Sequence, residues 1–95
     1  MTIYFALSLA VNRIKIGCCR GDPTERLRAH ARSAGAPLML LTTTHGGRRV
    51  ERWWHQRHEA AGDRYPLSGR LTEWFEPTPQ LWNDIGELLL QEYPA

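Results

Sequence analysis

The strongest constraint on the fold is an alternation of apolar side chains near the N-terminus. The alternating residues are Ile3, Phe5, Leu7 and Leu9 in a first run, and Ile14 and Ile16 in a second. Two such runs joined by a short turn are typical of a β-hairpin with one buried face. If the loop holds an even number of residues and the strands carry no bulge, the residue numbers of two paired positions add up to an odd number. The apolar residues then share one face, and Tyr4 and Lys15 become neighbours on the other.

The rest of the chain predicts three helices and a further strand. Asp22-Pro23-Thr24-Glu25 is typical of a helix start, and Gly35 of a helix end, so a helix is expected near 23–34. A buried strand is expected at 37–44, a helix at 48–61 ended by Gly62, a loop at 63–70, and a helix beginning at Thr78-Pro79. A short strand or a turn precedes the last helix. The expected fold is α+β: a three-stranded, mainly antiparallel sheet flanked by helices, in the order β-β-α-β-α-α.

Length and composition indicate one small domain spanning residues 1–95. The chain is 42% hydrophobic and 23% charged, which argues against intrinsic disorder. It contains no apolar run near the ~20 residues of a membrane helix and no signal-peptide pattern at the N-terminus. A soluble, cytoplasmic protein is expected. Cys18 and Cys19 are adjacent and therefore poorly suited to a structural disulfide, consistent with a reducing compartment.

The basic residues are almost all arginines. The net charge is only +2, but Lys15 is the only lysine among 12 basic residues. The planar guanidinium group suits phosphate recognition, which favours a phosphate ligand. A bias in the base composition of the coding DNA would give the same arginine excess, so both explanations stay open.

Two expected helices carry polar side chains at helical spacing. Arg26 and His30 are four residues apart and face the same way. Glu51, His55 and His58 follow at i, i+4 and i+7 and form a polar stripe. This stripe is either a solvated helix face or, with Cys18 or Cys19, part of a structural zinc site.

Tyr4, Lys15, Arg26 and Glu51 together supply the groups that phosphodiester hydrolysis needs. They offer a group to act on the water, cations for the phosphate charge, and an oxygen ligand for a metal. Magnesium keeps most of its waters and often takes only one or two carboxylates, so Glu51 alone would suffice.

The same residues resemble the GIY-YIG endonucleases, in particular a short branch found in bacterial and phage proteins. The resemblance covers residues 2 to about 76 and rests on Thr2-Ile3-Tyr4, Lys15-Ile16-Gly17, Arg26, His30, the segment from Glu51 to His55, and Glu73-Trp74-Phe75. Thr2 stands where the family has a glycine, and Lys15 where it has a second tyrosine. The late asparagine of the family has no clear counterpart.

The resemblance implies a role for each site residue. Tyr4 would act as general base or position the attacking water, with Lys15 supplying a neighbouring positive charge or contacting the phosphate. Arg26 would stabilise charge on phosphorus, and His30 would bond to Tyr4 or to a phosphate oxygen. Glu51 would hold Mg²⁺ or Mn²⁺. The expected activity is metal-dependent hydrolysis of DNA; the alternative is a DNA-binding module of the same fold with little or no turnover.

DNA is the expected partner, with no membrane partner. Weaker phosphate contacts are expected from Arg13, Arg20, Arg48, Arg49 and His55. We expect no appended DNA-reading domain of the kind many family members carry, and a homodimer or a separate DNA-reading partner is therefore an open expectation. The aromatic residues Trp74, Phe75 and Trp82 are expected to pack the last helix onto the sheet.

Overall fold

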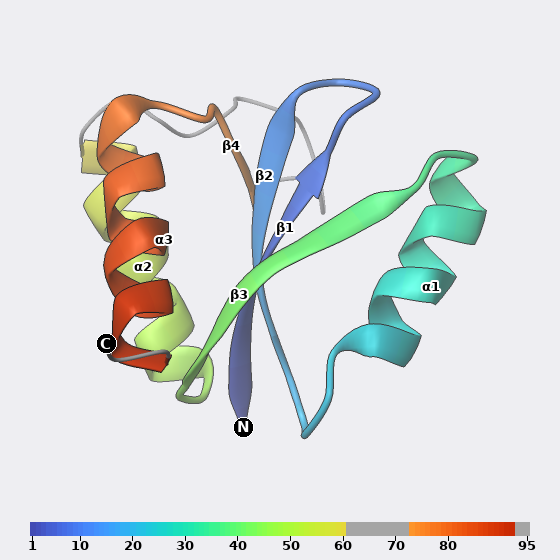
Figure 1. Cartoon of the computed structure of the whole chain (residues 1–95). Coiled ribbons are helices and arrows are strands. Elements are labelled where there is room, and N and C mark those ends of the chain that lie inside the picture. Colours follow the sequence, from blue (N-terminus) through green and yellow to red (C-terminus); the bar gives the residue numbers. More distant parts are fainter. Residues whose placement is uncertain (61–72, 93–95) are drawn as a thin grey trace.

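The computed structural model describes residues 1–60 and 73–92. Its sheet is antiparallel, has the order β3-β1-β2-β4, and consists of β1 (Thr2–Ser8), β2 (Arg13–Cys19), β3 (Leu38–His45) and β4 (Trp74–Phe75). The helices are α1 (Thr24–Ala34), α2 (Arg48–Ala60) and α3 (Pro79–Glu92). Helix α1 lies on one side of the sheet, and α2 and α3 lie on the other (Figure 1).

The α+β class is confirmed, but the strand count of three was wrong. The described sheet has four strands, because the segment left open as a short strand or a turn forms β4. Strand β4 pairs with β2 only through Phe75 opposite Ile14 and Trp74 opposite Lys15. The expected end of the second helix at residues 61–62 and the expected loop at 63–70 lie outside the described residues.

The hairpin register agrees with the prediction from parity. Tyr4 lies opposite Gly17 and Ala6 opposite Lys15, so each pair of positions sums to an odd number. Tyr4 and Lys15 therefore occupy the same face of the sheet, and the alternating apolar residues occupy the other. A register fixed in this way gives the sheet one apolar face and one mixed face.

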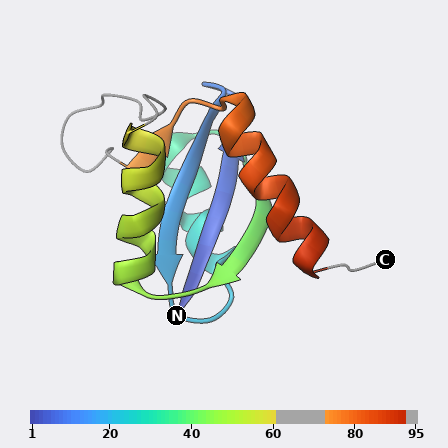
Figure 2. The same ribbon diagram turned by 90° about the vertical axis from the view of Figure 1, so that its left-hand side faces the viewer.

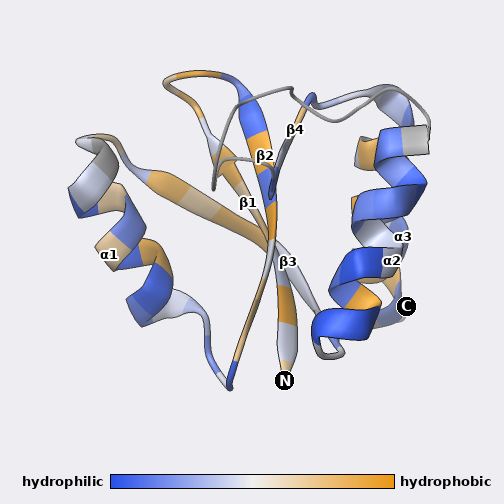
Figure 3. Cartoon of the chain, turned by 180° about the vertical axis from the view of Figure 1, so that it is seen from behind, coloured by the Kyte–Doolittle hydropathy of each residue, from blue (hydrophilic) through white to orange (hydrophobic). Residues whose placement is uncertain are grey.

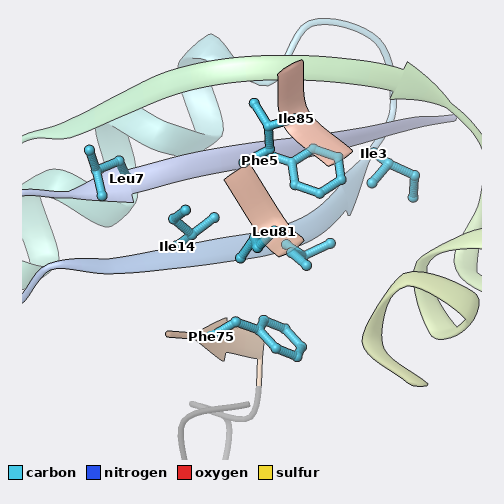
Figure 4. Packing of buried hydrophobic residues seen from close by; sticks show 8 residues of the cluster. Ile3, Phe5, Leu7, Ile14, Phe75, Leu81 and Ile85 are labelled. Atoms are coloured by element: carbon cyan, nitrogen blue, oxygen red, sulfur yellow. The ribbon is translucent and has the colours of Figure 1, made fainter. Parts of the chain in front are cut away.

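The apolar face forms the main core under α2 and α3. Its buried residues are Ile3, Phe5, Leu7, Ile14, Ile16, Phe75, Leu81 and Ile85 (Figure 4). Helix α2 runs over β2 and α3 runs over β3, so both helices cover this face (Figure 2). Trp54 of α2 packs against the core, with its ring edge-on to Phe5 at 5.2 Å between centroids.

A smaller cluster lies under α1 on the other face. It is formed by Tyr4, Ala6, Cys19 and Leu27. Hydrophobic segments are concentrated in the strands, whereas the helices on both sides are hydrophilic over much of their length (Figure 3). The space between α1 and the sheet is therefore lined partly by polar side chains that are themselves buried, including Lys15 and Ser8.

The ends of α1 follow the sequence signals. The Asp22 carboxylate accepts hydrogen bonds from the Thr24 amide at 2.9 Å and from the Thr24 hydroxyl at 2.6 Å, which caps the helix. Gly35 ends it in the left-handed conformation, at φ 68°. Glu25 does not close a capping box; it pairs with Arg28 at 3.0 Å.

A buried polar network joins α2 to α3. Arg57 donates two hydrogen bonds to the Asp84 carboxylate, at 2.7 and 3.0 Å, and His58 Nε2 lies 3.0 Å from Asp84 Oδ2. Phe75 is buried as expected, but Trp82 is 42% exposed, so its expected packing onto the sheet was wrong. Among the described helices, none combines the length and the apolarity needed to cross a bilayer.

We expect Asp84→Asn to lower the free energy of unfolding by about 2–4 kcal/mol, because it leaves Arg57 without its buried counter-charge. The Arg57 side chain lowers the pKa of Asp84 below its ordinary value of 3.8. The Asp84 contribution is therefore present above about pH 4 and is lost as the pH falls through the folded-state pKa.

Urea unfolding at several pH values measures both effects. The difference between wild type and Asp84→Asn should be constant from pH 5 to 7 and shrink below about pH 4. Glu76→Gln, which removes an exposed carboxylate between β4 and α3, is the matched control. An equal effect of the two substitutions at pH 7 would contradict the role of the network.

Candidate active site

Tyr4 lies directly over Gly17 on the face covered by α1. The two residues are paired across the hairpin, and a Cβ added to Gly17 would collide with the Tyr4 ring and hydroxyl. Only glycine leaves room for the ring here. The tyrosine is 1% exposed and belongs to the small cluster with Leu27 of α1. Gly17 therefore sets the position of the phenol.

The hydroxyl of Tyr4 is hydrogen-bonded by Arg26, which α1 holds above it. Burial and the charge of Glu73 raise the pKa of Tyr4 to about 12, and the Arg26 guanidinium only partly offsets them. The phenol is thus protonated at neutral pH. The cation that favours its ionised form is Arg26; Lys15, to which this role was first assigned, has other partners.

Lys15 is a buried cation held between two side chains. Its Nζ donates to His30 Nε2 at 3.2 Å and lies 3.4 Å from Glu73 Oε2. The Trp74 ring lies 6.0 Å from the same nitrogen. His30 was expected to bond to Tyr4 or to a phosphate; in the structure its partner is Lys15. Burial, with the nearby Lys15 and Arg26, lowers the pKa of His30, so the ring is neutral at pH 7 and can accept from the lysine.

Glu51 approaches the same site from the first turn of α2. Burial and the charge of Glu73 raise its pKa, while His55, Arg48 and Lys15 act in the opposite direction. These influences show that Glu51 and Glu73 share one electrostatic environment. Two carboxylates so placed destabilise each other's charged form.

A hydrogen bond at the edge of β2 joins α2 to the strand that carries Lys15. Because β4 pairs only with Ile14 and Lys15, the next carbonyl along β2, that of Ile16, is available to another partner. His55 Nε2 of α2 donates to it at 2.8 Å. This bond holds the α2 segment that carries Glu51 against the strand that carries Lys15.

The candidate site thus combines residues of β1, β2, α1 and α2 with the residue that directly precedes β4. The structure brings Tyr4, Lys15, Arg26 and His30 together on the face under α1, while Glu51, on α2 at the other side of the sheet, interacts with Lys15 through its charge. The same group includes Glu73, to which the sequence analysis assigned no role of its own. The available signal was its place in the Glu73-Trp74-Phe75 segment, since the pairing of Trp74 with Lys15 brings the preceding residue to the lysine.

The predicted weaker phosphate contacts separate into two groups. Arg20, Arg48 and Arg49 are exposed. Arg13 donates to the carbonyls of Val11 and Asn12 in the hairpin loop, and His55 to that of Ile16. In the structure, Arg13 and His55 therefore donate to backbone carbonyls, and their contact with phosphate stays a prediction.

The zinc interpretation of the α2 stripe was wrong. His55 bonds to the Ile16 carbonyl and His58 to Asp84, on different neighbours. The Cys18 thiol donates to the Gly46 carbonyl at 3.8 Å, and the Cys19 thiol to the Gly21 carbonyl at 3.6 Å. Over residues 1–60 and 73–92, no three His, Cys, Asp or Glu side chains are grouped so as to hold a metal ion.

A family model describes nearly the whole chain. The T5orf172 domain matches residues 1–89. The chain belongs to the T5orf172 domain family. This phage-associated family is consistent with a nuclease-like or DNA-binding role, and the match does not single out the GIY-YIG family. No curated protein and no solved structure matches the chain.

We expect Gly17→Ala to lower the free energy of unfolding by about 1–3 kcal/mol, because the added methyl group must displace the Tyr4 ring. Gly86→Ala is the matched control, since a Cβ at Gly86 meets nothing within 4 Å. In helix α3 it should leave stability unchanged or raise it by up to about 1 kcal/mol. Urea unfolding distinguishes the two, and equal stabilities would contradict the contact.

We expect Glu73→Gln to lower the pKa of Tyr4 below about 12, because a negative charge that disfavours the phenolate is removed. NMR titration of ¹³Cζ-labelled tyrosine measures this, with Tyr4→Phe assigning the resonance. Glu87→Gln, far from the phenol on α3, should leave the titration unchanged. An unchanged or higher Tyr4 pKa in Glu73→Gln would show that Glu73 does not act on the phenol.

Proposed function

We propose that this protein is an endonuclease that hydrolyses DNA phosphodiester bonds with a divalent metal ion. The observation that carries the proposal is the grouping of Tyr4, Lys15 and Arg26, which are distant in the sequence, on one face of the sheet, with Glu51 of α2 near enough for its charge to interact with Lys15. Membership in the T5orf172 family supports a nuclease-like or DNA-binding role in general.

Arg26 and Lys15 would stabilise the negative charge that develops on the phosphate. The Arg26 guanidinium is exposed and already lies at the Tyr4 hydroxyl. Lys15 is buried and held by His30 and Glu73, so its ammonium group has a fixed position. Cations placed before the reaction stabilise the transition state without reorganisation.

Tyr4 would position the attacking water. Because its pKa is about 12, the phenol keeps its proton near neutral pH and is a hydrogen-bonding group there, in preference to the general base first considered. The hydroxyl oxygen of Tyr4 accepts a hydrogen bond from Arg26, so its own O–H can donate to the attacking water. In the overall hydrolysis, water adds to phosphorus, the bond to the leaving oxygen breaks, and that oxygen ends with a proton from the water.

Glu51 would hold Mg²⁺ or Mn²⁺, with Glu73 as the second carboxylate in the same environment. Burial and, after it, the charge of Glu73 raise the pKa of Glu51, and a divalent cation bound there would favour the ionised carboxylate. One or two carboxylates suffice for Mg²⁺. When bound, such an ion supplies polarisation of the phosphate.

A binding module without turnover is the second candidate. It is favoured by the phenol being protonated and by the Lys15 charge being paired with Glu73. Such a module would bind DNA with an affinity that falls as salt rises, and Glu51→Ala would leave that affinity unchanged.

Cleavage of labelled DNA, both plasmid and oligonucleotides, with Mg²⁺, Mn²⁺ or chelator tests the proposal. We expect wild-type cleavage to require the metal and to fall by about 10²-fold or more in Glu51→Gln and Arg26→Gln. Glu87→Gln, which removes an exposed carboxylate outside the site, should cleave as wild type. Wild-type rates no higher than those of Glu51→Gln under both ions would exclude catalysis and leave the binding module.

A further inference from the structure

We infer that a cavity between the beginnings of α1 and α2 is a subsite for an unpaired nucleotide next to the bond that is cut. The inference rests on the proposed function, because it takes the phosphodiester bond to be cut at the candidate active site. It gives the substrate a class: DNA that is single-stranded, or that has an unpaired nucleotide beside the cleavage site.

The cavity is open and has a volume of about 490 Å³. Its walls include three arginines: Arg20 after β2, Arg26 of α1 and Arg48 of α2. Arg26 is also the residue that hydrogen-bonds Tyr4. The cavity therefore borders the candidate active site at one shared side chain, and we place the part of a DNA strand next to the bond that is cut in it.

The arginines of the cavity are available to an anion. The two carboxylates on its rim have local partners, since Asp22 caps α1 at Thr24 and Glu25 pairs with Arg28. Within the part of the chain that the structure describes, no carboxylate lies within ion-pair distance of the three arginines. Guanidinium groups match the geometry of phosphate oxygens.

Sulfur-containing residues complete the lining of the cavity: Met1, Cys18 and Cys19. A site with phosphate ligands on one side and sulfur atoms on the other suits a nucleotide whose base enters together with its phosphate. A base inside a duplex is stacked and paired and cannot enter such a concave site, whereas an unpaired base can.

Binding measured without metal tests the subsite separately from cleavage. Fluorescence anisotropy in EDTA compares a labelled 12-nucleotide single strand with the duplex of the same sequence. We expect wild type to prefer the single strand, and Arg20→Gln and Arg48→Gln each to weaken that binding about tenfold. Each should also reduce the slope of log affinity against log salt by about 0.7, as expected for one lost phosphate contact.

Arg52→Gln is the matched control, because Arg52 is an exposed arginine in the next turn of α2 that does not line the cavity. It should bind both DNAs nearly as wild type does. Circular dichroism and urea unfolding establish that all variants are folded. Equal effects of the three substitutions, tighter binding of duplex than of single strand, or no binding of either would overturn the inference.

The thiol of Cys18 gives a second readout. In a Cys19→Ala background, the single strand should slow alkylation of Cys18 by iodoacetamide severalfold, because the nucleotide covers that wall. Alkylation unaffected by saturating DNA would place the strand elsewhere and overturn the inference. Arginine-dependent binding of the single strand with no cleavage of any DNA would keep the subsite and remove the proposed activity.

Discussion

The pairing register of the β1–β2 hairpin is the constraint on which the rest of the structure depends. With Tyr4 opposite Gly17, the alternating apolar residues of the two strands, from Ile3 to Ile16, face α2 and α3, whereas Tyr4 and Lys15 face α1. A shift of one residue would exchange the two faces of one strand. The same register also places the phenol over the glycine, where any larger side chain would displace it. The main core and the candidate site are thus two consequences of one pairing.

Charge compensation organises the polar face. Lys15 is buried, and a buried ammonium group needs a partner; Glu73 and the neutral His30 provide it. The Glu73 charge that stabilises the lysine also raises the pKa values of Tyr4 and Glu51. In the free protein, these groups therefore balance one another. An incoming phosphate would compete with Glu73 for Lys15, and this competition links binding at the site to the protonation of the phenol and of Glu51.

Sequence patterns within single strands and helices made much of this arrangement predictable. Contacts between segments that are far apart in the chain were missed. Alternation gave the hairpin and the shared face of Tyr4 and Lys15, and Asp22 gave the start of α1. The role of Glu73 depends on where β4 joins β2, a pairing of only two residues that has no periodic signal. The exposure of Trp82 likewise depends on which side of α3 meets the sheet, and that side is fixed by Leu81 and Ile85.

The polar stripe of α2 shows why spacing on a helix does not by itself define a site. Glu51, His55 and His58 lie on one face, but seven residues at 1.5 Å each separate the ends of the stripe by roughly 10 Å. The three side chains therefore meet different neighbours. Glu51 shares the electrostatic environment of Lys15 and Glu73, His55 bonds to the β2 backbone, and His58 joins α3 through Asp84. One helix face thus serves the candidate site at its beginning and the stability of the fold at its end.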